Sequence, residues 1–442
     1  MSEDGTAMSS RGADPHTAPR SGVAAWALWD CGATGVNAVV VTFVFSVYLT
    51  EHVGSGLPGS STPASWLGQA LTIAGLCVAL LAPATGVWVN APNRRRTALT
   101  VLTGLVVALT AAMSLIRTDY HYLLPGLALL ACTAACSDLA TVPYNAMLRQ
   151  VSTEENSGRV SGLGLAAGFL GSVLLLMIVY VGFIQGDGDT RGLLGIAAHD
   201  GNNVRASMVL VAGWLALCAW PLLISARAPA HAEERRHVGF FGAYRALWDE
   251  LKGEWRRDRN VVYYLLASAV FRDGLTGVFT FGAVLGVGVY GLSPADVLVF
   301  GVCASTVAAI GAFLGGRLDD AVGSKRVITG ALTAMIGVGL ALLASSGPQA
   351  FWICGLLLCL FIGPTMASAR ALMLHLSADG KEGVAFGLYT TTGRAASFLA
   401  PWMFFTFIDA FDSERAGLAG LGLVLAIGLT AMIVVRVPRE AH

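Results

Sequence analysis

The stretch that decides the fold is G-R-L-D-D-A-V-G-S-K-R at residues 316–326, because G-V-W-V-N-A-P-N-R-R-R at residues 86–96 repeats its pattern 230 positions earlier. A glycine opens each copy and two basic residues close it. The matched positions are Gly86 with Gly316, Asn90 with Asp320, and Arg95-Arg96 with Lys325-Arg326. A glycine lets two helix ends cross closely, an acidic side chain can cap or pair with the next helix, and a basic pair holds that helix end at a membrane surface.

Two further sets of matched positions support a duplication. Three glycines of one predicted helix recur 225 positions later in another: Gly158, Gly162 and Gly168 correspond to Gly383, Gly387 and Gly393. An acidic residue also recurs within a predicted helix, as Asp30 in the first half and Asp273 in the second. Duplicated membrane bundles of this kind rock against each other around a site between the halves. The predicted fold class is an all-α polytopic membrane protein with two pseudo-symmetric six-helix bundles.

The composition excludes a soluble domain. Apolar residues make up 55% of the 442 residues and charged residues 13%, about half the roughly 25% of a soluble domain. A bilayer core about 30 Å thick is crossed by roughly 20 apolar helical residues. Twelve segments meet this requirement: 24–50, 64–89, 97–116, 122–147, 158–184, 205–226, 260–290, 295–316, 326–345, 350–374, 384–410 and 417–436.

Lysine and arginine are distributed unevenly among the loops. With a cytoplasmic N-terminus, inner segments carry 21 of the 28 basic residues, and outer loops carry only Arg117, Arg191, Arg205 and Arg415. Positive charge stays on the cytoplasmic side, so both termini and both repeated loops are predicted to be cytoplasmic, in a cell membrane. The predicted order is a tail at 1–22, a bundle at 23–226, a linker with an amphipathic helix at 227–259, a second bundle at 260–437 and a tail at 438–442.

Features of other protein classes are missing from the sequence. The formal net charge is zero, which gives no basis for a nucleic-acid partner. The eight cysteines lie in apolar segments without a Cys-x-x-Cys pair, so we interpret them as packing residues rather than disulfides or metal ligands. The sequence contains no phosphate-binding P-loop and no nucleophile elbow. Neither an enzyme nor a bound cofactor is expected.

Two carboxylates within the predicted helices are candidates for proton coupling. Asp30 lies about 10 Å from the inner surface, at roughly 1.5 Å per helical residue, and Asp273 lies near the middle of the bilayer. A carboxylate at such depth can take up and release a proton as its surroundings change. The alternative for both is a structural carboxylate that pairs with an arginine or caps a broken helix.

Three arginines lie within predicted spans. Arg272 does not face Asp273, because adjacent helical side chains point about 100° apart, so it needs a partner on another helix, for which Asp138 is a candidate. Arg394 is too deep to reach the surface; it is expected to bind an anionic group of the substrate or to pair with one of the two helical aspartates. Arg370 lies close enough to a helix end to reach the membrane surface. The polar and aromatic side chains predicted to complete the site are Asn37, Tyr144, Asn145 and Tyr389.

These patterns resemble the major facilitator superfamily. The loop at 316–326 resembles the signature of that superfamily, at Gly316, Asp320, Gly323, Lys325 and Arg326, whereas the first copy has Asn90 at the usual aspartate and Asn93 at the usual glycine. A narrower resemblance, over most of residues 24–437, is to the vacuole-effluxer-like ("unknown major facilitator") family. Its segments are W-A-L-W-D at 26–30, P-Y-N-A-M-L at 143–148, G-R-V-S-G-L-G at 158–164, F-G-L-Y at 386–389 and G-R at 393–394.

The resemblance implies a twelve-helix transporter that exports amino acids or similar small solutes. We expect secondary active transport by alternating access, with protons as the coupling ion, in a lipid-embedded monomer. The alternative is a transport-inactive binding or regulatory protein with the same fold. Asn90 suggests it, as does the stretch Cys31-Gly32-Ala33, where the family has an aromatic residue, a small residue and an asparagine. Substrate-dependent proton movement separates the two hypotheses.

Overall fold

The computed structural model describes residues 20–56, 62–186, 188–225, 245 and 259–436. Their regular structure is helical except for a two-stranded antiparallel hairpin, β1 (Thr190–Arg191) with β2 (Ile196–Ala197). The predicted linker helix lies outside the described residues except for positions 245 and 259, and so do the tail at 438–442 and residues 1–19. Residues 20–22, predicted as tail, already belong to the first helix.

The first bundle is built from apolar helices, two of which begin at a proline in the first turn, where its missing N–H leaves no hydrogen bond unmade. Its first span, Ser21–Val53, passes from α-helix into π-helix and has a bend at Val44. The helices are α1 (Arg20–Val36), η1 (Asn37–Phe43), α2 (Phe45–Val47), η2 (Tyr48–Val53), α3 (Pro63–Trp88), α4 (Pro92–Ala112), α5 (Leu123–Ala146), α6 (Leu148–Val151), α7 (Ser157–Val179), η6 (Tyr180–Ile184) and α8 (Asn202–Ser225).

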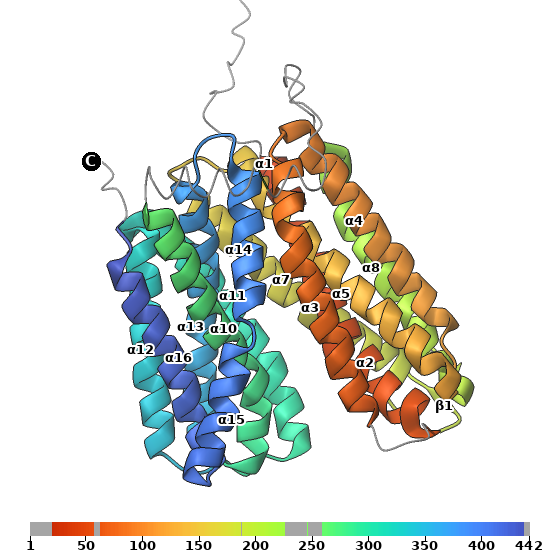
Figure 1. Cartoon of the computed structure of the whole chain (residues 1–442). Helices are drawn as coiled ribbons and strands as arrows, with labels where there is room; N and C mark the ends of the chain where they lie inside the picture. Colours follow the sequence, from red (N-terminus) through yellow and green to blue (C-terminus); the bar gives the residue numbers. More distant parts are fainter. Residues whose placement is uncertain (1–19, 57–61, 187, 226–244, 246–258, 437–442) are drawn as a thin grey trace, which may run out of the picture.

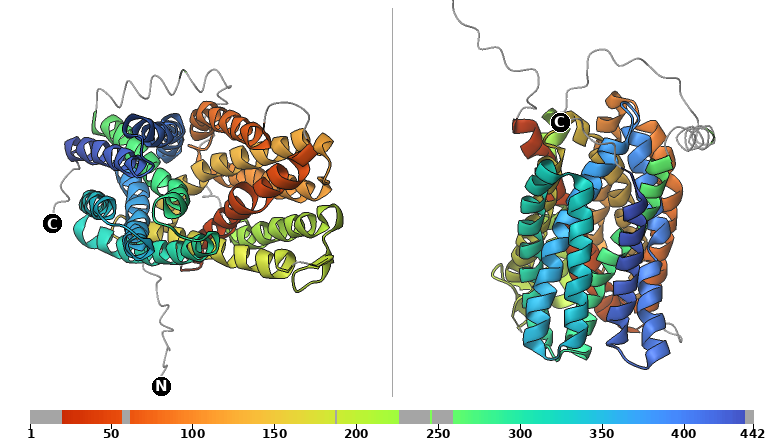
Figure 2. Two further views of the ribbon diagram at one scale, coloured as in Figure 1. Left: turned by 90° about the horizontal axis from the view of Figure 1, so that it is seen from below. Right: turned by 90° about the vertical axis from the view of Figure 1, so that its left-hand side faces the viewer.

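The second bundle repeats this arrangement. Its helices are α10 (Arg259–Gly288), α11 (Pro294–Val322), α12 (Ser324–Ala344), α13 (Pro348–Leu376), α14 (Glu382–Ala396), α15 (Leu399–Phe411) and α16 (Ala416–Val434). The two bundles stand side by side (Figures 1 and 2), close together at one end and apart at the other. The close end carries residues 86–96 and 316–326, and we call it the loop-motif end.

Eleven of the described helices are long and apolar enough to cross a membrane. They correspond to eleven of the twelve predicted spans. The segment 384–410, predicted as one span, is instead divided into α14 and α15 around Ser397 and Phe398. Pro401 explains the break, because a proline has no N–H for the carbonyl four residues earlier, that of Ser397, and its ring clashes with that carbonyl.

Two helix crossings join the bundles at the loop-motif end. Where α3 meets α14, a Cβ atom added to Gly86 would lie 2.5 Å from the carbonyl oxygen of Gly383. Where α11 meets α7, a Cβ atom added to Gly316 would lie 2.5 Å from the carbonyl oxygen of Gly158. Only glycine allows backbones to approach this closely. At each crossing, the loop-motif glycine of one bundle therefore contacts the repeated helix glycine of the other bundle.

Charged side chains surround both crossings. Glu382, at the start of α14, is 2% exposed and forms ion pairs with two arginines of the first bundle, at 2.7 Å to Arg95 Nη2 and 2.8 Å to Arg149 Nε. At the other crossing, Asp320 accepts a hydrogen bond from the Arg159 backbone N–H at 3.1 Å and lies 3.5 Å from Arg159 Nε. The predicted loop motifs thus hold the bundles together at this end.

The glycine and the remaining basic residues that end the motifs make contacts close to their own helices. Gly323 has a φ of +87°, a conformation that favours glycine, and it lets α12 begin directly after α11. Lys325 donates from Nζ to the carbonyl oxygen of Val435 at 2.6 Å, at the end of α16. Arg326 donates at 3.2 Å to the last carbonyl of α11, and Arg96 is half-exposed at the start of α4. Lys325 therefore secures its own bundle, whereas its repeat partner Arg95 reaches across to the other.

The glycine crossing can be tested by adding a single methyl group. We expect Gly86→Ala to lower the thermal unfolding midpoint of the purified protein, because the added Cβ meets backbone and overpacking destabilises by about 1–3 kcal/mol. Gly337→Ala is the matched control, since a Cβ there meets nothing within 4 Å and alanine is the better helix former. Equal midpoint changes for the two variants would contradict the tight crossing.

The charge cluster at Glu382 yields a second prediction. Glu382→Gln should destabilise the protein by about 3–5 kcal/mol, because it leaves buried arginine charge without its carboxylate. Asp379→Asn is the control: Asp379 also pairs with Arg149, but its side chain is 88% exposed, and exposed pairs contribute little. Unfolding midpoints of both variants, measured in the same detergent, check the difference; a Glu382→Gln protein as stable as Asp379→Asn would refute it.

Candidate functional site

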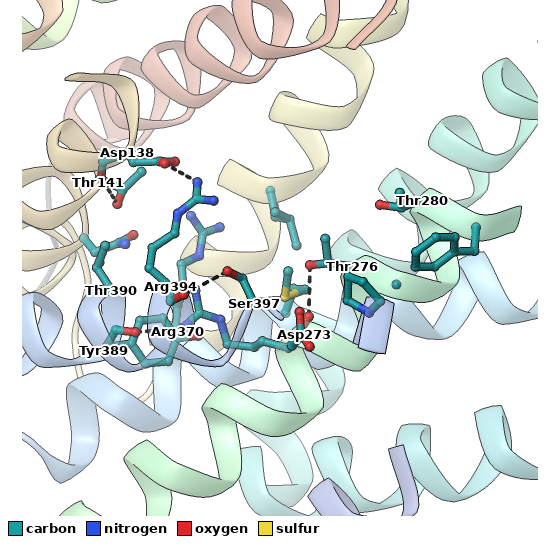
Figure 3. A pocket seen from close by; sticks show the side chains of 18 residues that line it. Asp138, Thr141, Asp273, Thr276, Thr280, Arg370, Tyr389, Thr390, Arg394 and Ser397 are labelled. Atoms are coloured by element: carbon teal, nitrogen blue, oxygen red, sulfur yellow. Dashed lines mark hydrogen bonds and ion pairs between the residues drawn. The ribbon is translucent and has the colours of Figure 1, made fainter. Parts of the chain in front are cut away.

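A cavity of about 480 Å³ lies between the bundles, beyond the crossings. Residues of α5 and α7 line one side, and residues of α10, α13, α14 and α15 line the other. Figure 3 shows the side chains that line it. The charged residues of the lining are Asp138, Arg272, Asp273, Arg370 and Arg394. Sequence analysis predicted four of these five as site residues.

An ion pair crosses the cavity from one bundle to the other. Arg394 Nη2, on α14, donates to Asp138 Oδ2, on α5 (Figure 3). The side chains are 40% and 20% exposed, so water reaches both. Asp138 was predicted as a partner of Arg272, and that pairing is wrong, because the side chain of Arg394 reaches across the gap to Asp138. Arg394 likewise pairs with neither of the two aspartates considered for it.

Arg272 lies against Tyr389 instead. Its guanidinium carbon stands 3.7 Å from the centre of the Tyr389 ring, and Nη1 donates to the Tyr389 carbonyl oxygen at 3.0 Å. A cation over an aromatic face is stabilised by the ring quadrupole. A Cβ atom added to Gly393 would lie 3.0 Å from Arg272 Nη1. The missing side chain at Gly393 therefore leaves the space in which the guanidinium lies.

The Asp273 side chain binds the backbone at the break between α14 and α15. Its Oδ2 accepts a hydrogen bond from the backbone N–H of Ala400 at 2.6 Å, in the first turn of α15. The first N–H groups of a helix have no partner within the helix, and the N-terminus carries partial positive charge. In this structure Asp273 occupies the position of a helix cap, which is the structural alternative for this residue.

Asp30 forms an ion pair with Arg370, which lines the cavity. Arg370 Nη1, on α13, lies 3.1 Å from Asp30 Oδ2, on α1, and its Nη2 donates to the Ser161 carbonyl oxygen at 2.8 Å. Both are less than a tenth exposed. The prediction that Arg370 reaches the membrane surface is wrong, because the first bundle covers this part of α13 and provides the carboxylate. A single residue of the second bundle thus holds two helices of the first.

The polar and aromatic candidates fall into two groups. Asn145 and Tyr389 line the cavity. Tyr144 lies in the packing between α1 and α5, stacked on Trp26 and Trp29 with ring centres 4.3 Å apart in each case. Asn37 begins the π-helical part of the first span and is exposed, and it is not part of the cavity lining. Helical periodicity alone could not separate these positions, because it does not show which face of a helix borders the cavity.

Several residues of the site were not predicted. Hydroxyl groups of Thr276, Thr280 and Ser397 line the cavity, and the sequence signal was only a polar residue within an apolar span. Glu382 and Arg149, which form ion pairs at the crossing of α3 and α14, were not predicted as functional residues either. Within the described part of the chain, no three His, Cys, Asp or Glu side chains gather as a possible metal site. The described cysteines are unbonded thiols.

Comparison with known proteins agrees with this arrangement. The sequence matches the profile of the Major Facilitator Superfamily over residues 31–401. It is 22% identical, over 94% of both chains, to the uncharacterized MFS-type transporter YxiO of Bacillus subtilis (strain 168).

Solved structures of the superfamily share the fold. FucP in the outward conformation has a TM-score of 0.71 at 16% identity, covering 95% of this chain and 99% of that one. XylE, a proton:xylose symporter, has a TM-score of 0.71 at 15% identity, covering 93% and 94%. A bacterial homologue of the iron transporter ferroportin has a TM-score of 0.64 at 14% identity, covering 94% and 97%. The chain therefore belongs to the Major Facilitator Superfamily, and it is a membrane transporter rather than an enzyme.

Proposed function

We propose that this protein is a proton-coupled secondary transporter that moves a small solute by alternating access. The observation that carries the proposal is the cross-bundle pair of Asp30 and Arg370, which lies between the cavity and the closed loop-motif end. The pair must separate if the bundles are to part at that end. A charge whose partner is removed inside a membrane protein is costly. A proton on Asp30 removes one of the two charges and lowers the cost of separation.

The loop-motif end is assigned to the cytoplasm on the distribution of lysine and arginine. On this assignment, the cavity is closed toward the cytoplasm by the two glycine crossings and by Glu382, and the bundles diverge toward the outside (Figure 1). Both termini are then cytoplasmic, in the cell membrane. Proton uptake by Asp30 would accompany the passage to the state that opens inward.

Two observations favour transport over the transport-inactive alternative. The first loop copy lacks the usual aspartate at Asn90, yet that crossing has a buried carboxylate from the opposite bundle, Glu382. Arg95 Nη2 pairs with it and also lies 3.3 Å from the Asn90 carbonyl oxygen. The cavity, in addition, is lined by charged groups from both bundles, which is the arrangement expected of a site for a polar solute. The departure at Asn90 therefore replaces the source of negative charge without removing it.

Export of an amino acid or similar small solute follows from the resemblance to the vacuole-effluxer-like family. Proton coupling agrees with XylE, a proton:xylose symporter of the same fold. Because the cavity lies wholly between the two bundles of one chain, a monomer surrounded by lipid suffices for the cycle.

Proton coupling through Asp30 is testable in liposomes loaded with a pH-sensitive dye. Addition of a substrate found from a panel of amino acids, small acids and sugars should move protons with the unaltered protein. Asp30→Asn should reduce this proton signal to the level of empty liposomes, because an amide cannot take up the proton.

Asp409→Asn is the matched control, since Asp409 is an exposed carboxylate on α15, and its proton signal should remain. Solute uptake measured in parallel with a labelled substrate separates coupling from transport. Solute movement with no proton signal in the unaltered protein would refute proton coupling, and an unchanged signal in Asp30→Asn would refute the role of Asp30.

A further inference from the structure

We propose that the substrate carries a carboxylate and that Arg272 binds it directly. This inference rests on the proposed function, because it takes the cavity between the bundles as the transport site. It deepens that function by assigning the group on the substrate that is recognised and the residue that recognises it.

Two of the three arginines around the cavity have carboxylate partners. Arg394 is paired with Asp138, and Arg370 is paired with Asp30. Asp273 forms no ion pair among the described residues; its carboxylate accepts a hydrogen bond from the Ala400 N–H at the N-terminus of α15. Arg272 is the cavity arginine for which the described part of the chain provides no carboxylate.

The contacts of Arg272 leave most of its donors available. A guanidinium has five N–H donors, and one of them is used on the carbonyl oxygen of Tyr389. The Tyr389 ring covers one face of the group at 3.7 Å, and Gly393 provides the space beside it. These contacts hold the guanidinium in place without neutralising it. A positioned guanidinium with free N–H groups fits the two oxygens of a carboxylate in bidentate geometry.

The charge of the site favours a monoanion. Phosphate carries up to two negative charges near neutral pH and is normally bound by more than one cation or by several backbone N–H groups. Two of the cavity arginines have carboxylate partners and the Asp273 carboxylate is held at the N-terminus of α15, so Arg272 is the one guanidinium of the lining without an ion-pair partner among the described residues. A carboxylate matches that charge, and a phosphate ester leaves part of its own charge without a partner.

A second polar group, on the opposite side of the cavity, further restricts the chemical class of the substrate. Asn145, on α5, lines the cavity and is 6% exposed, and its Oδ1 has no hydrogen-bond partner. A buried acceptor without a partner is costly, so a donor on the substrate would be stabilised there. Phe281 and Met366 contribute apolar surface, and the volume of about 480 Å³ lies within the usual range for small-molecule sites. The structure thus points to a small carboxylic acid that also carries an amino or hydroxyl group.

The test is ligand-induced stabilisation of the purified full-length protein, because a ligand that binds the folded state raises the unfolding midpoint. The panel consists of small amino acids and hydroxy acids, each beside its neutral carboxamide, together with inorganic phosphate and simple sugars. We expect at least one acid to raise the midpoint in a concentration-dependent manner, and its carboxamide to have no effect. Arg272→Gln should weaken binding of that acid by about tenfold or more, as for loss of a charged hydrogen-bond partner.

Two further variants separate recognition from folding. Arg272→Lys retains the positive charge without the bidentate geometry, so it should bind more tightly than Arg272→Gln and more weakly than the unaltered protein. Arg317→Gln is the matched control, because Arg317 also lies over an aromatic ring, 3.8 Å from the centre of Phe313, but outside the cavity lining; its ligand response should equal that of the unaltered protein.

The proposal is overturned if carboxamides or sugars stabilise the protein as well as the acids do, if phosphate alone does so, if no acid has an effect, or if Arg272→Gln keeps the full response. Binding is measured here without a membrane or a proton gradient. A carboxylate response therefore stands even if the liposome assay detects no proton movement, and proton coupling stands even if the ligand proves to be uncharged. The two proposals fail independently.

Discussion

A charged side chain surrounded by lipid needs an opposite charge, a helix end or water beside it, and this constraint organises the whole contact between the two bundles. The carboxylates near the centre of the molecule are bound by arginines of the opposite bundle or by a helix N-terminus. Among the described residues, four cross-bundle ion pairs or clusters result: Asp30 with Arg370, Asp138 with Arg394, Asp320 with Arg159, and Glu382 with Arg95 and Arg149. These charges are therefore paired only when the two bundles are in contact.

The two crossings show how a duplicated chain can use one geometry with different charges. Matched glycines give both crossings the same close approach. At one crossing, the loop motif supplies the carboxylate, Asp320, and the opposite helix supplies Arg159. At the other, the loop motif supplies Arg95 and the opposite helix supplies Glu382. The attraction is retained although its direction is reversed, which is why a loop without its usual aspartate still holds its end of the molecule closed.

Much of this could be predicted from the sequence, because hydropathy and repeats are local properties of the chain. The span positions, the duplication and the crossing glycines follow from periodicity and spacing. The identity of the ion pairs could not be predicted, since it depends on which helix faces which and on how far each is rotated. Arg370 illustrates the difficulty: its depth in α13 suits either a surface position or a buried pair, and only the presence of α1 decides between them. The break before α15 could have been predicted from Pro401. Hydropathy alone does not reveal it, because the residues around the break are apolar.

The use of ion pairs, rather than apolar packing, also explains how a firmly closed end can open again. Removing two charges from water costs nearly as much as their attraction returns, so a buried ion pair contributes little net stability compared with apolar side chains of the same volume. When the crossings at Gly86 and Gly316 separate, water enters and solvates Glu382, Arg95 and Arg149, which offsets the loss of their attraction. An apolar contact would gain nothing from that water. In the proposed transport cycle, the closed state would therefore be specific in its geometry without a large gain in free energy from its ion pairs, so that a proton on Asp30 would shift the balance.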